Sequence, residues 1–215
     1  MTNGFGILGG SFDPIHFGHL RCAEEIRQRF SLEKVIFIPT YAPPHKPPES
    51  VLEYRHRKAM VRAALGSNPH FILEDIEERL PVPSYTSRTI QAVVRKYGGG
   101  TDFCFILGDD DFSSMGAWHS PSEIFRQCDV IVITRHAAGR TLQQLLPVDL
   151  KDEFWYPERE GVLVHKQGKK VYLSSIPMLD ISSSRIRSFV KQRLSVRYLT
   201  TDPVIEYIDK ERLYY

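Results

Sequence analysis

Cysteine is scarce in this chain of 215 residues, and long apolar runs are absent from it. The three cysteines, Cys22, Cys104 and Cys128, are far apart, and none belongs to a C-x-x-C pair or to the Cys/His spacing of a zinc site. An odd number of dispersed cysteines indicates free thiols in a reducing compartment. No segment approaches the ~20 apolar residues of a membrane-spanning helix. We therefore expect a cytoplasmic protein with no membrane partner and no metal site made by its own side chains.

A strong excess of one charge is also lacking. The 28 lysines and arginines nearly balance the 26 aspartates and glutamates, so the net charge is +2. Because nucleic acid is usually bound by a clustered basic surface, we expect no nucleic-acid partner. The length and the apolar content of 42% are typical of a protein with a sizeable core. We predict that residues 1–215 form a single domain, with a C-terminal helical portion from residue 180 to 215 packed on it.

The most informative stretch is GGSFDPIHFGHL, at residues 9–20. The apolar run at residues 5–8 predicts a buried parallel strand, and helical spacing of apolar residues from Gly18 to Phe30 predicts a helix. Between them, Gly9 and Gly10 let the backbone turn sharply and approach a ligand closely. The helix then directs its free N–H groups and its positive dipole end back at the turn. The sequence therefore predicts an anion site.

Two histidines, His16 and His19, are predicted to project to the same side of this helix start. Imidazoles there suit the α-phosphate of a nucleotide, where negative charge grows during attack. In an isolated H-x-x-H pair, His16 would more simply be a turn residue and His19 a local cap. A G-x-G-x-x-G match at residues 4–9 does not indicate a dinucleotide site, because it lies inside the predicted strand instead of opening a helix.

The full twelve-residue stretch, with its H-x-G-H core, resembles the signature of the HxGH nucleotidyltransferase superfamily, and specifically of the bacterial nicotinate mononucleotide adenylyltransferases. Shorter forms of it occur in pantetheine-phosphate adenylyltransferases, cytidylyltransferases and class I aminoacyl-tRNA synthetases. The resemblance implies that the adenylyl group of ATP is transferred to nicotinate mononucleotide, giving nicotinate adenine dinucleotide and pyrophosphate in NAD biosynthesis. It also implies catalysis by His16 and His19, and ATP binding by Gly9, Gly10, Ser11, Phe12, His16 and His19.

A proline-rich loop follows the second predicted strand, residues 35–39. Ligands bind past the carboxyl ends of parallel strands, and this loop occupies such a position. Its PPHK segment, with His45 and Lys46, resembles the family's nucleotide-contacting loop, which implies that both residues bind nicotinate mononucleotide. The alternative for Lys46 is a solvated surface turn.

The helix predicted to run through Tyr97 opens with the segment PSYTSRTI, at residues 83–90. Free N–H groups at a helix start suit a carboxylate. The S-Y-T match implies that Tyr85 and Thr86 hold the nicotinate carboxylate, while ordinary capping by Thr86 or Ser87 is compatible with that role. Trp118 aligns with the family's tryptophan that stacks on the pyridine ring, with core packing as the alternative.

The strand predicted at residues 102–107 ends in Gly108 and three aspartates. An acid past a strand end can accept hydrogen bonds from ribose hydroxyls. The family's G-x-D pattern aligns with Gly108 and Asp110, which implies an ATP-binding role for both. Asp109 stands where family members often have a small residue, so the sequence leaves open whether Asp109, Asp110 or Asp111 contacts the ribose.

Two later segments complete the implied ATP site. Arg135 follows the strand predicted at residues 130–133 and matches the arginine that lies against adenine, although residues 136–139 replace the usual proline and glycine. The hydroxyl-rich segment DISSSRIR resembles the family's I-S-S/T-x-x-I-R motif, which implies that Ser182, Ser183 and Arg187 bind the ATP phosphates. A serine cap without ligand is the alternative for this motif.

We expect an α/β fold, a Rossmann-like doubly wound and mainly parallel sheet with helices on both faces. The implied cofactor is Mg²⁺, bound mainly through the ATP phosphates, and the implied partners are ATP and nicotinate mononucleotide. Two alternatives stay open, a related HxGH adenylyltransferase that prefers nicotinamide mononucleotide or phosphopantetheine, and a non-catalytic nucleotide-binding protein. The basic residues Arg55, Arg57, Lys58 and Arg62 are interpreted as a solvated helix face. The sequence leaves open a homodimer and any role of residues 140–175.

Overall fold

The computed structural model describes residues 4–98, 100–135, 139–157, 161–177 and 179–215, with only the backbone described at Arg135. The described strands are β1 (Phe5–Gly10), β2 (Lys34–Pro39), β3 (Phe71–Leu73), β4 (Phe103–Gly108), β5 (Asp129–Arg135), β6 (Phe154–Trp155), β7 (Val162–His165) and β8 (Lys170–Ile176). They form one eight-stranded sheet in the order β3-β2-β1-β4-β5-β8-β7-β6.

Parallel pairing dominates this sheet. The strands β3, β2, β1, β4, β5 and β8 pair parallel in turn, while β7 and β6 add an antiparallel edge. The chain builds outward from β1 to β3 in one direction and from β4 to β5 in the other, so the strand order reverses between β1 and β4. Ligands bind at such a reversal in open α/β sheets. The expected mainly parallel, doubly wound sheet is confirmed.

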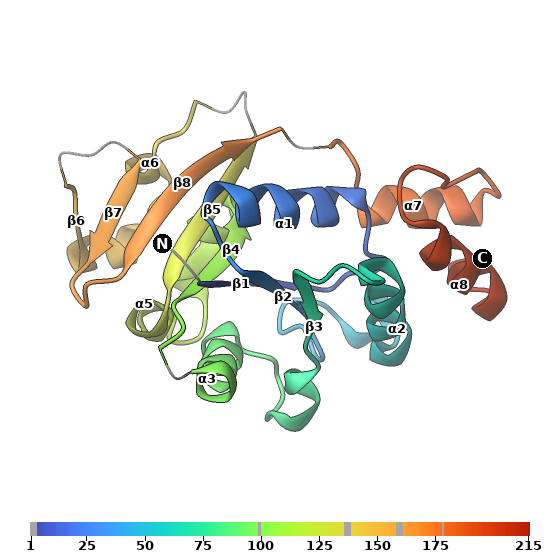
Figure 1. The fold of residues 1–215 in the computed structure, drawn as a ribbon, viewed down its shortest axis with the longest axis horizontal. Coiled ribbons are helices and arrows are strands. Elements are labelled where there is room, and N and C mark those ends of the chain that lie inside the picture. The colour runs from blue at the N-terminus through green and yellow to red at the C-terminus, as the bar shows by residue number, and fades with distance from the viewer. Residues whose placement is uncertain (1–3, 99, 136–138, 158–160, 178) are drawn as a thin grey trace.

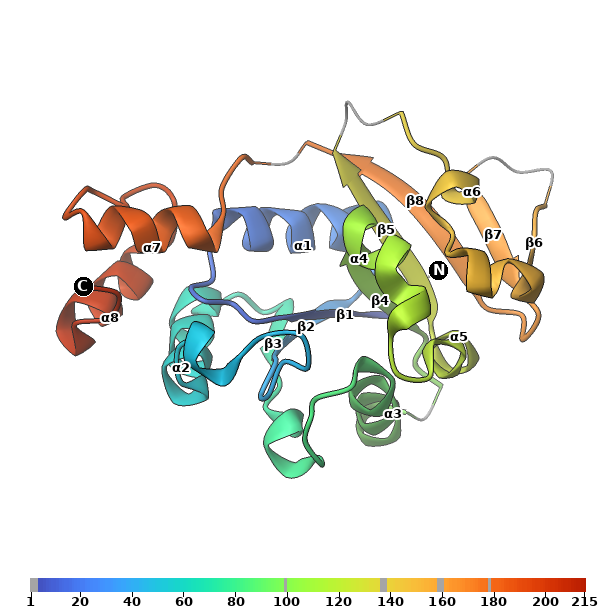
Figure 2. The ribbon, with the colours of Figure 1, turned by 180° about the vertical axis from the view of Figure 1, so that it is seen from behind.

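Helices cover both faces of the sheet (Figures 1 and 2), with α1 along one side and α3 and α5 on the opposite side. The described helices are α1 (Phe17–Arg29), α2 (Tyr54–Leu65), α3 (Thr86–Tyr97), α4 (Asp109–Ser114), α5 (Ile124–Gln127), α6 (Leu142–Leu145), α7 (Ser183–Lys191) and α8 (Asp202–Glu211). No described helix has the length and apolar character needed to cross a membrane.

Alternate side chains of the central strands enter two separate cores. In β1, Ile7 packs with α3, α4, α5 and α6, whereas its neighbour Leu8 packs with α1, α2, α7 and α8. The same alternation separates Phe105 from Ile106 in β4. Because successive strand residues point to opposite faces, a strand buried on both sides must be apolar at nearly every position. This explains the continuous apolar runs in the sequence.

The C-terminal helices α7 and α8 lie at one end of α1 (Figure 1) and contribute to the second core. Two hydrogen bonds link this region to the start of α1. Phe17 donates its N–H to the Leu199 carbonyl at 3.0 Å, and the Thr200 hydroxyl donates to the Ile15 carbonyl at 2.8 Å. Segments about 180 residues apart in sequence therefore meet at the α1 N-terminus.

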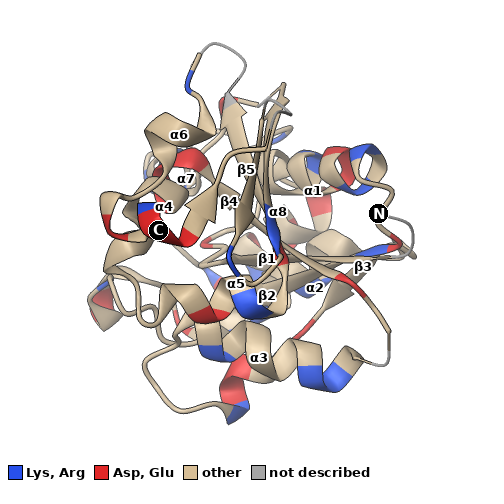
Figure 3. Cartoon of the chain, turned by 90° about the vertical axis from the view of Figure 1, so that its left-hand side faces the viewer, with Lys and Arg blue, Asp and Glu red and all other residues tan. Residues whose placement is uncertain are grey.

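Charged side chains of both signs alternate along α1 (Figure 3). Arg21 pairs with Glu25 at 2.9 Å, and Arg27 pairs with Glu24 at 2.8 Å. Pairs of this kind, between side chains in contact with solvent, are worth about 0.3–0.5 kcal/mol each on a helix. They make this surface well solvated and give it no basic stripe.

Candidate active site

The loop after β1 turns later than the sequence suggested. β1 continues through Gly10, which pairs with Pro39 of β2, so the expectation of a sharp turn at Gly9 and Gly10 is wrong. The left-handed conformation falls instead on Phe12, with φ of 48°. The Phe12 ring is buried in the second core, where it holds this strained position by packing.

Gly9 nevertheless has a property that suits a ligand site. A Cβ placed on Gly9 would meet no atom within 4 Å, so the space beside this backbone at the end of β1 is open. At Gly10, in contrast, a Cβ would lie 3.2 Å from the Phe12 ring. The lack of a side chain at Gly9 is therefore not explained by packing inside the protein, and it leaves the backbone accessible.

His16 and His19 come together at the start of α1. His16 is the N-cap of the helix, and the two imidazole rings stack with their centroids 3.7 Å apart and an interplanar angle of 26°. The His16 backbone N–H donates to Nδ1 of His19 at 3.3 Å. Since Nδ1 of His19 accepts a hydrogen bond, the proton of the neutral ring lies on Nε2, which is therefore a donor.

The position of the His16 ring explains why a glycine lies between the two histidines. A Cβ on Gly18 would lie 2.9 Å from Nδ1 of His16 and 3.0 Å from Cε1 of the same ring. Real Cβ atoms do not approach so closely, so His16 needs glycine at residue 18 to occupy its position. Nδ1 of His16 is buried with no hydrogen-bond partner. A buried polar atom without a protein partner is unusual, which makes His16 a candidate ligand-binding group.

Both histidines are neutral at physiological pH. Burial lowers the pKa of His16 from 6.5 to about 4. Burial also lowers the pKa of His19 well below its ordinary value, and the nearby His16 lowers it further because two positive rings would repel each other. Each neutral ring keeps one N–H, so the pair can donate hydrogen bonds to phosphate oxygens without carrying a positive charge.

The hydroxyl-rich motif lies against the loop after β1. The Ser183 hydroxyl donates to the Pro14 carbonyl at 2.8 Å, and Nη1 of Arg187 donates to the Asp13 carbonyl at 2.7 Å. Ser182 is the N-cap of α7, and its hydroxyl accepts the Arg185 N–H at 3.2 Å. The structure thus brings this motif beside the histidine pair, as the resemblance requires, while the serine hydroxyls already have protein partners.

Lys46 also reaches this loop. Its Nζ donates to the Ser11 hydroxyl at 3.0 Å, across 35 residues of sequence. The ammonium group is in contact with solvent. His45 is exposed on the proline-rich loop and makes no described hydrogen bond. Of the two residues predicted in this loop, Lys46 is the one that the fold brings to the phosphate motif.

The start of α3 differs from the capping that the sequence suggested. The N-cap is Tyr85, and no side chain caps the helix. The Ser87 hydroxyl donates instead to the His119 carbonyl at 3.0 Å, so the capping prediction is wrong. The Tyr85 ring stacks on the His119 ring, with their centroids 4.2 Å apart. The Arg88 guanidinium carbon lies 5.0 Å from the Tyr85 ring centroid. The uncapped helix start, with Thr86 as its first residue, has free N–H groups for an anion.

Trp118 lies next to this helix start, because Ser87 holds the adjacent residue His119. The Trp118 ring is partly buried and contacts Phe105 edge to face, with centroids 6.4 Å apart. One part of the ring therefore packs on the first core while another part stays accessible. His119 carried no signal in the sequence, since an exposed histidine beside a tryptophan matches no motif.

The acids after β4 differ in exposure. Gly108 is the N-cap of α4, the Asp110 side chain is 95% exposed, and the Asp109 side chain is 19% exposed. Nη1 of Arg140 lies 3.7 Å from Asp110 and 4.0 Å from Asp109. Arg140 was not a candidate from the sequence. Arg135 ends β5, but its side chain and residues 136–138 lie outside the described part of the chain.

The interpretation of the basic residues on α2 as a solvated face is wrong for Arg57, whereas Arg55 and Arg62 are exposed as expected. Arg57 is 2% exposed, and its guanidinium donates to four backbone carbonyls, those of Ser11, Thr40, Tyr41 and Leu52, at 2.7 to 3.4 Å. Burial lowers the pKa of Arg57, and the negative charge of Asp13 opposes that effect. The residue joins the ends of β1 and β2 beyond their last paired residues.

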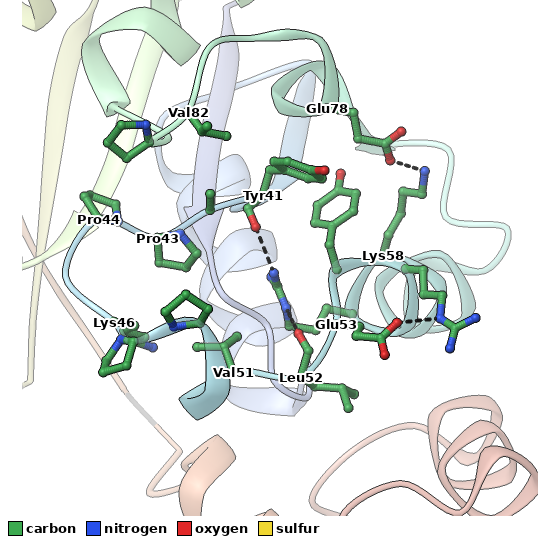
Figure 4. Close-up of a pocket in the computed structure, with 17 residues that line it drawn as sticks. Tyr41, Pro43, Pro44, Lys46, Val51, Leu52, Glu53, Lys58, Glu78 and Val82 are labelled. Carbon is green, nitrogen blue, oxygen red and sulfur yellow. Dashed lines mark hydrogen bonds and ion pairs between the residues drawn. The ribbon is translucent and has the colours of Figure 1, made fainter.

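A cavity of about 980 Å³ lies beside the proline-rich loop (Figure 4). Prolines form one wall, and ion pairs between Lys58 and Glu78 and between Arg55 and Glu53 lie at its edge. Lys46 is the one predicted site residue that contributes to the lining. The cavity is thus adjacent to the phosphate motif but contains neither histidine of the pair.

The chain matches the cytidylyltransferase-like family model over residues 7–189. It is 44% identical over 211 residues to a probable nicotinate-nucleotide adenylyltransferase of Geobacter metallireducens, with 97% of each chain covered. It is 38% identical over 210 residues to a relative with the same description from Syntrophotalea carbinolica, with 97% of this chain and 96% of the relative covered. The chain belongs to the nicotinate-nucleotide adenylyltransferase family. The matched residues 7–189 of this nicotinate-nucleotide adenylyltransferase family member include both motifs, at the N-termini of α1 and α7.

Solved structures show the same fold. The nicotinic acid mononucleotide adenylyltransferase of Plasmodium falciparum complexed with NaAD is similar with a TM-score of 0.73, at 22% identity, covering 99% of this chain and 97% of that one. A putative nicotinate-nucleotide adenylyltransferase from Vibrio parahaemolyticus gives a TM-score of 0.64 at 17% identity, covering 99% and 96%. The nicotinate-nucleotide adenylyltransferase fold therefore extends over nearly the whole chain.

Proposed function

We propose that the protein transfers the adenylyl group of ATP to nicotinate mononucleotide, giving nicotinate adenine dinucleotide and pyrophosphate. The observation that carries this proposal is the neutral histidine pair at the α1 N-terminus, which faces the α7 N-terminus and Arg187 across the loop after β1. Both motifs therefore contact the same loop, in a chain of the nicotinate-nucleotide adenylyltransferase family.

The nucleophile is the phosphate oxygen of the mononucleotide, which is already anionic near pH 7. No residue has to remove a proton from it, and no covalent enzyme intermediate is needed. The oxygen attacks the α-phosphorus of ATP, the new P–O bond forms, and the bond to the pyrophosphate leaving group breaks. The tasks of the protein are alignment of the two nucleotides and stabilisation of the charge that develops on the α-phosphate.

We assign His16 and His19 to the α-phosphate. Nε2–H of His19 is free to donate, because Nδ1 of the same ring is occupied by the His16 backbone. The unpartnered Nδ1 of His16 is the second polar atom of the stack. Neutral donors held in a fixed position need no reorganisation when charge develops on the phosphate, which is the property of an oxyanion site.

The remaining donor-side residues are assigned from their positions around the pair. Arg187 and the free N–H groups of α7 at Ser182 and Ser183 bind the pyrophosphate end, since the serine hydroxyls are already engaged. Gly9, Gly10, Ser11 and Phe12 contact ATP through their backbone, and Gly108, Asp110 and Arg135 bind the nucleoside. When bound, Mg²⁺ neutralises the charge of the leaving phosphates. Among the described residues no cluster of three or more His, Cys, Asp or Glu could hold a metal, so phosphate oxygens and water are the ligands in this proposal.

On the acceptor side, we assign Lys46 to the phosphate of the mononucleotide and the α3 N-terminus to the nicotinate carboxylate. An uncapped helix start favours an anion, so the acid should be preferred over the neutral amide. Tyr85, Thr86 and Trp118 complete this side, with Trp118 on the pyridine ring, and we assign the exposed His45 to the same substrate. We further propose that the enzyme acts in the cytoplasm on these two soluble nucleotides, and that a homodimer is its assembly.

Pyrophosphate release from ATP and Mg²⁺ tests the proposal directly. Purified protein is incubated with nicotinate mononucleotide, nicotinamide mononucleotide or phosphopantetheine in parallel. We expect release with the acid and much slower release with the amide. Release with the amide alone, or with phosphopantetheine alone, would replace the acceptor while keeping the adenylyl transfer. No release with any acceptor would reject the proposed activity and leave a nucleotide-binding protein.

A further inference from the structure

Glu77 is a buried carboxylate that no catalytic role explains. It lies in a short helical turn at Ile76–Arg79, after β3, and is 5% exposed. Its two oxygens have different partners: Oε2 accepts the Tyr41 N–H at 2.8 Å, and Oε1 accepts the Thr89 hydroxyl at 2.7 Å. Tyr41 begins the proline-rich loop that carries Lys46, and Thr89 lies in the first turn of α3. One carboxylate thus joins the two segments that face the acceptor.

Residues 40–42 follow β2 directly and form the stem of the proline-rich loop, the loop stem. The Ala42 N–H donates to the Ser84 hydroxyl at 3.1 Å, and the Ser84 N–H donates to the Ala42 carbonyl at 3.0 Å. Ser84 is the residue directly before Tyr85. The contact made by Glu77 is therefore continued by a second pair of hydrogen bonds, and together they set the separation between the loop stem and the α3 N-terminus.

Opposite charges hold the two sides of the Tyr41 peptide. Glu77 accepts the Tyr41 N–H, while the Arg57 guanidinium donates to the carbonyls of Thr40 and Tyr41 at 2.8 and 3.4 Å. The charge of Glu77 is among those that oppose the effect of burial on the pKa of Arg57. Both side chains are buried, so their hydrogen bonds to this peptide are shielded from water.

The loop itself has little means to fix its own shape. Four of its residues, Pro43, Pro44, Pro47 and Pro48, have no N–H to donate. Within the loop, the Lys46 N–H bond to the Pro43 carbonyl is long, at 3.4 Å. Apart from the bond between the Lys46 side chain and Ser11, the loop is held at the stem, where the backbone groups have buried partners.

We propose that Glu77 is a positioning residue for the acceptor mononucleotide. It keeps the Lys46 loop and the α3 N-terminus at the separation that lets one ligand contact both. The proposal rests on the proposed function for the identity of the acceptor. The ATP contacts proposed above lie on β1, β4, β5 and the N-termini of α1 and α7 instead, so the loss of Glu77 should act on acceptor binding far more than on ATP binding. A purely structural role would lower stability without separating the two substrates.

The variants Glu77→Ala and Glu77→Gln make the kinetic test. In Glu77→Gln the amide oxygen can accept the Tyr41 N–H, while the amide NH₂ donates to Thr89, whose hydroxyl proton can turn to the Tyr85 carbonyl 3.3 Å away. We expect Glu77→Ala to raise KM for nicotinate mononucleotide by about 10-fold or more. KM for ATP should change by less than about 3-fold. Glu77→Gln should restore most of the loss. The adjacent Glu78, which pairs with Lys58 at the cavity edge, supplies the control Glu78→Ala, with unchanged KM values.

Amide hydrogen exchange gives a readout that does not depend on activity. In Glu77→Ala, residues 40–46 and 84–89 should both exchange faster than in the wild type, while Glu77→Gln stays near the wild type. Equal rises in both KM values, or faster exchange confined to residues 76–80, would overturn the proposal. If the wild type releases no pyrophosphate with any acceptor, the proposed function fails. The exchange experiment then still decides whether Glu77 couples the two segments.

Discussion

The hydroxyl of Tyr214 donates a hydrogen bond of 2.6 Å to Oδ1 of Asp13, across 201 residues of sequence. Asp13 is 5% exposed, and its Oδ2 accepts the Leu52 N–H at 3.3 Å. The Asp13 carbonyl accepts from Arg187, whose guanidinium also lies 3.8 Å from Oδ2. Burial raises the pKa of Tyr214, and the bond to Asp13 raises it further, so the phenol stays a donor. Through Asp13, Tyr214 controls the surroundings of the arginine assigned to pyrophosphate.

Replacing this phenol should therefore affect both stability and activity. Tyr214→Phe leaves a buried carboxylate oxygen without a donor, which costs about 1–3 kcal/mol in free energy of unfolding. The freed oxygen should also draw the Arg187 side chain toward Asp13 and lower kcat. Urea denaturation and steady-state kinetics measure the two effects. Tyr215→Phe is the control, because Tyr215 is 62% exposed and its bond to Asp209 is on the surface, so its free energy of unfolding should be nearly unchanged. Equal effects of both variants would contradict this role.

Gly9→Ala tests where ATP binds without disturbing the fold. The added methyl meets no protein atom within 4 Å, so the free energy of unfolding should not fall. If ATP approaches this backbone, the methyl occupies the ligand's space and KM for ATP rises about 10-fold or more. Gly18→Ala makes the contrast, because its Cβ would collide with the His16 ring and should lower both stability and kcat. An unchanged KM for ATP in Gly9→Ala would remove Gly9 from the ATP site.

His19→Ala should cut kcat by about 10²-fold or more, since comparable loss of one oxyanion donor has that size. The free energy of unfolding should fall by no more than about 1–3 kcal/mol, for the lost stack on His16 and the lost acceptor of the His16 N–H. His70 is exposed and lies just before β3, near the start of β2 and away from the histidine pair. His70→Ala is therefore the matched control and should keep normal kcat. Normal turnover by His19→Ala would show that the stacked pair supports the helix start and does not act on phosphate.

The pKa of His16 predicts a pH dependence of stability with a definite sign. The unfolded chain takes up a proton on His16 near pH 6.5, whereas the folded protein resists it until about pH 4. His16 therefore leaves stability unaffected above pH 6.5 and lowers it progressively as the pH falls from 6.5 to 4. NMR titration of the ligand-free protein, with His16→Asn to assign the resonance, measures this directly. A His16 resonance that titrates near pH 6.5 would contradict the neutral stacked pair.

Arg57→Lys should not be a conservative change. A lysine ammonium cannot reach four carbonyls on three segments at once, so at least one buried carbonyl loses its donor, at a cost of about 1–3 kcal/mol. Arg62→Lys, on the exposed face of the same helix, should change stability by less than about 0.5 kcal/mol. Thermal and urea unfolding compare the two. Equal stability of both variants would mean that water replaces the guanidinium without loss.

Local patterns in the sequence were sufficient for much of this protein. Continuous apolar runs such as residues 35–39 predicted strands buried on both faces, and the structure has β2 there. The motifs around His16 and Ser182 each combine a helix start with polar residues, and this pairing depends on neighbouring residues alone. The family and the fold could be inferred from such signals, because a motif of adjacent residues is complete within the sequence.

What the tertiary structure alone decided concerns groups whose partners are distant in sequence. The helical spacing of α2 does not distinguish Arg57 from Arg62, since which arginine is buried depends on carbonyls supplied by residues 11, 40, 41 and 52. Glu77 likewise resembles its neighbour Glu78 until Tyr41 and Thr89 are brought to it. The turn falls at Phe12 because core packing compensates its unfavourable φ, and no local preference encodes that compensation. The sequence determined which groups can bind phosphate, and the packing of remote segments determined how those groups are held in place.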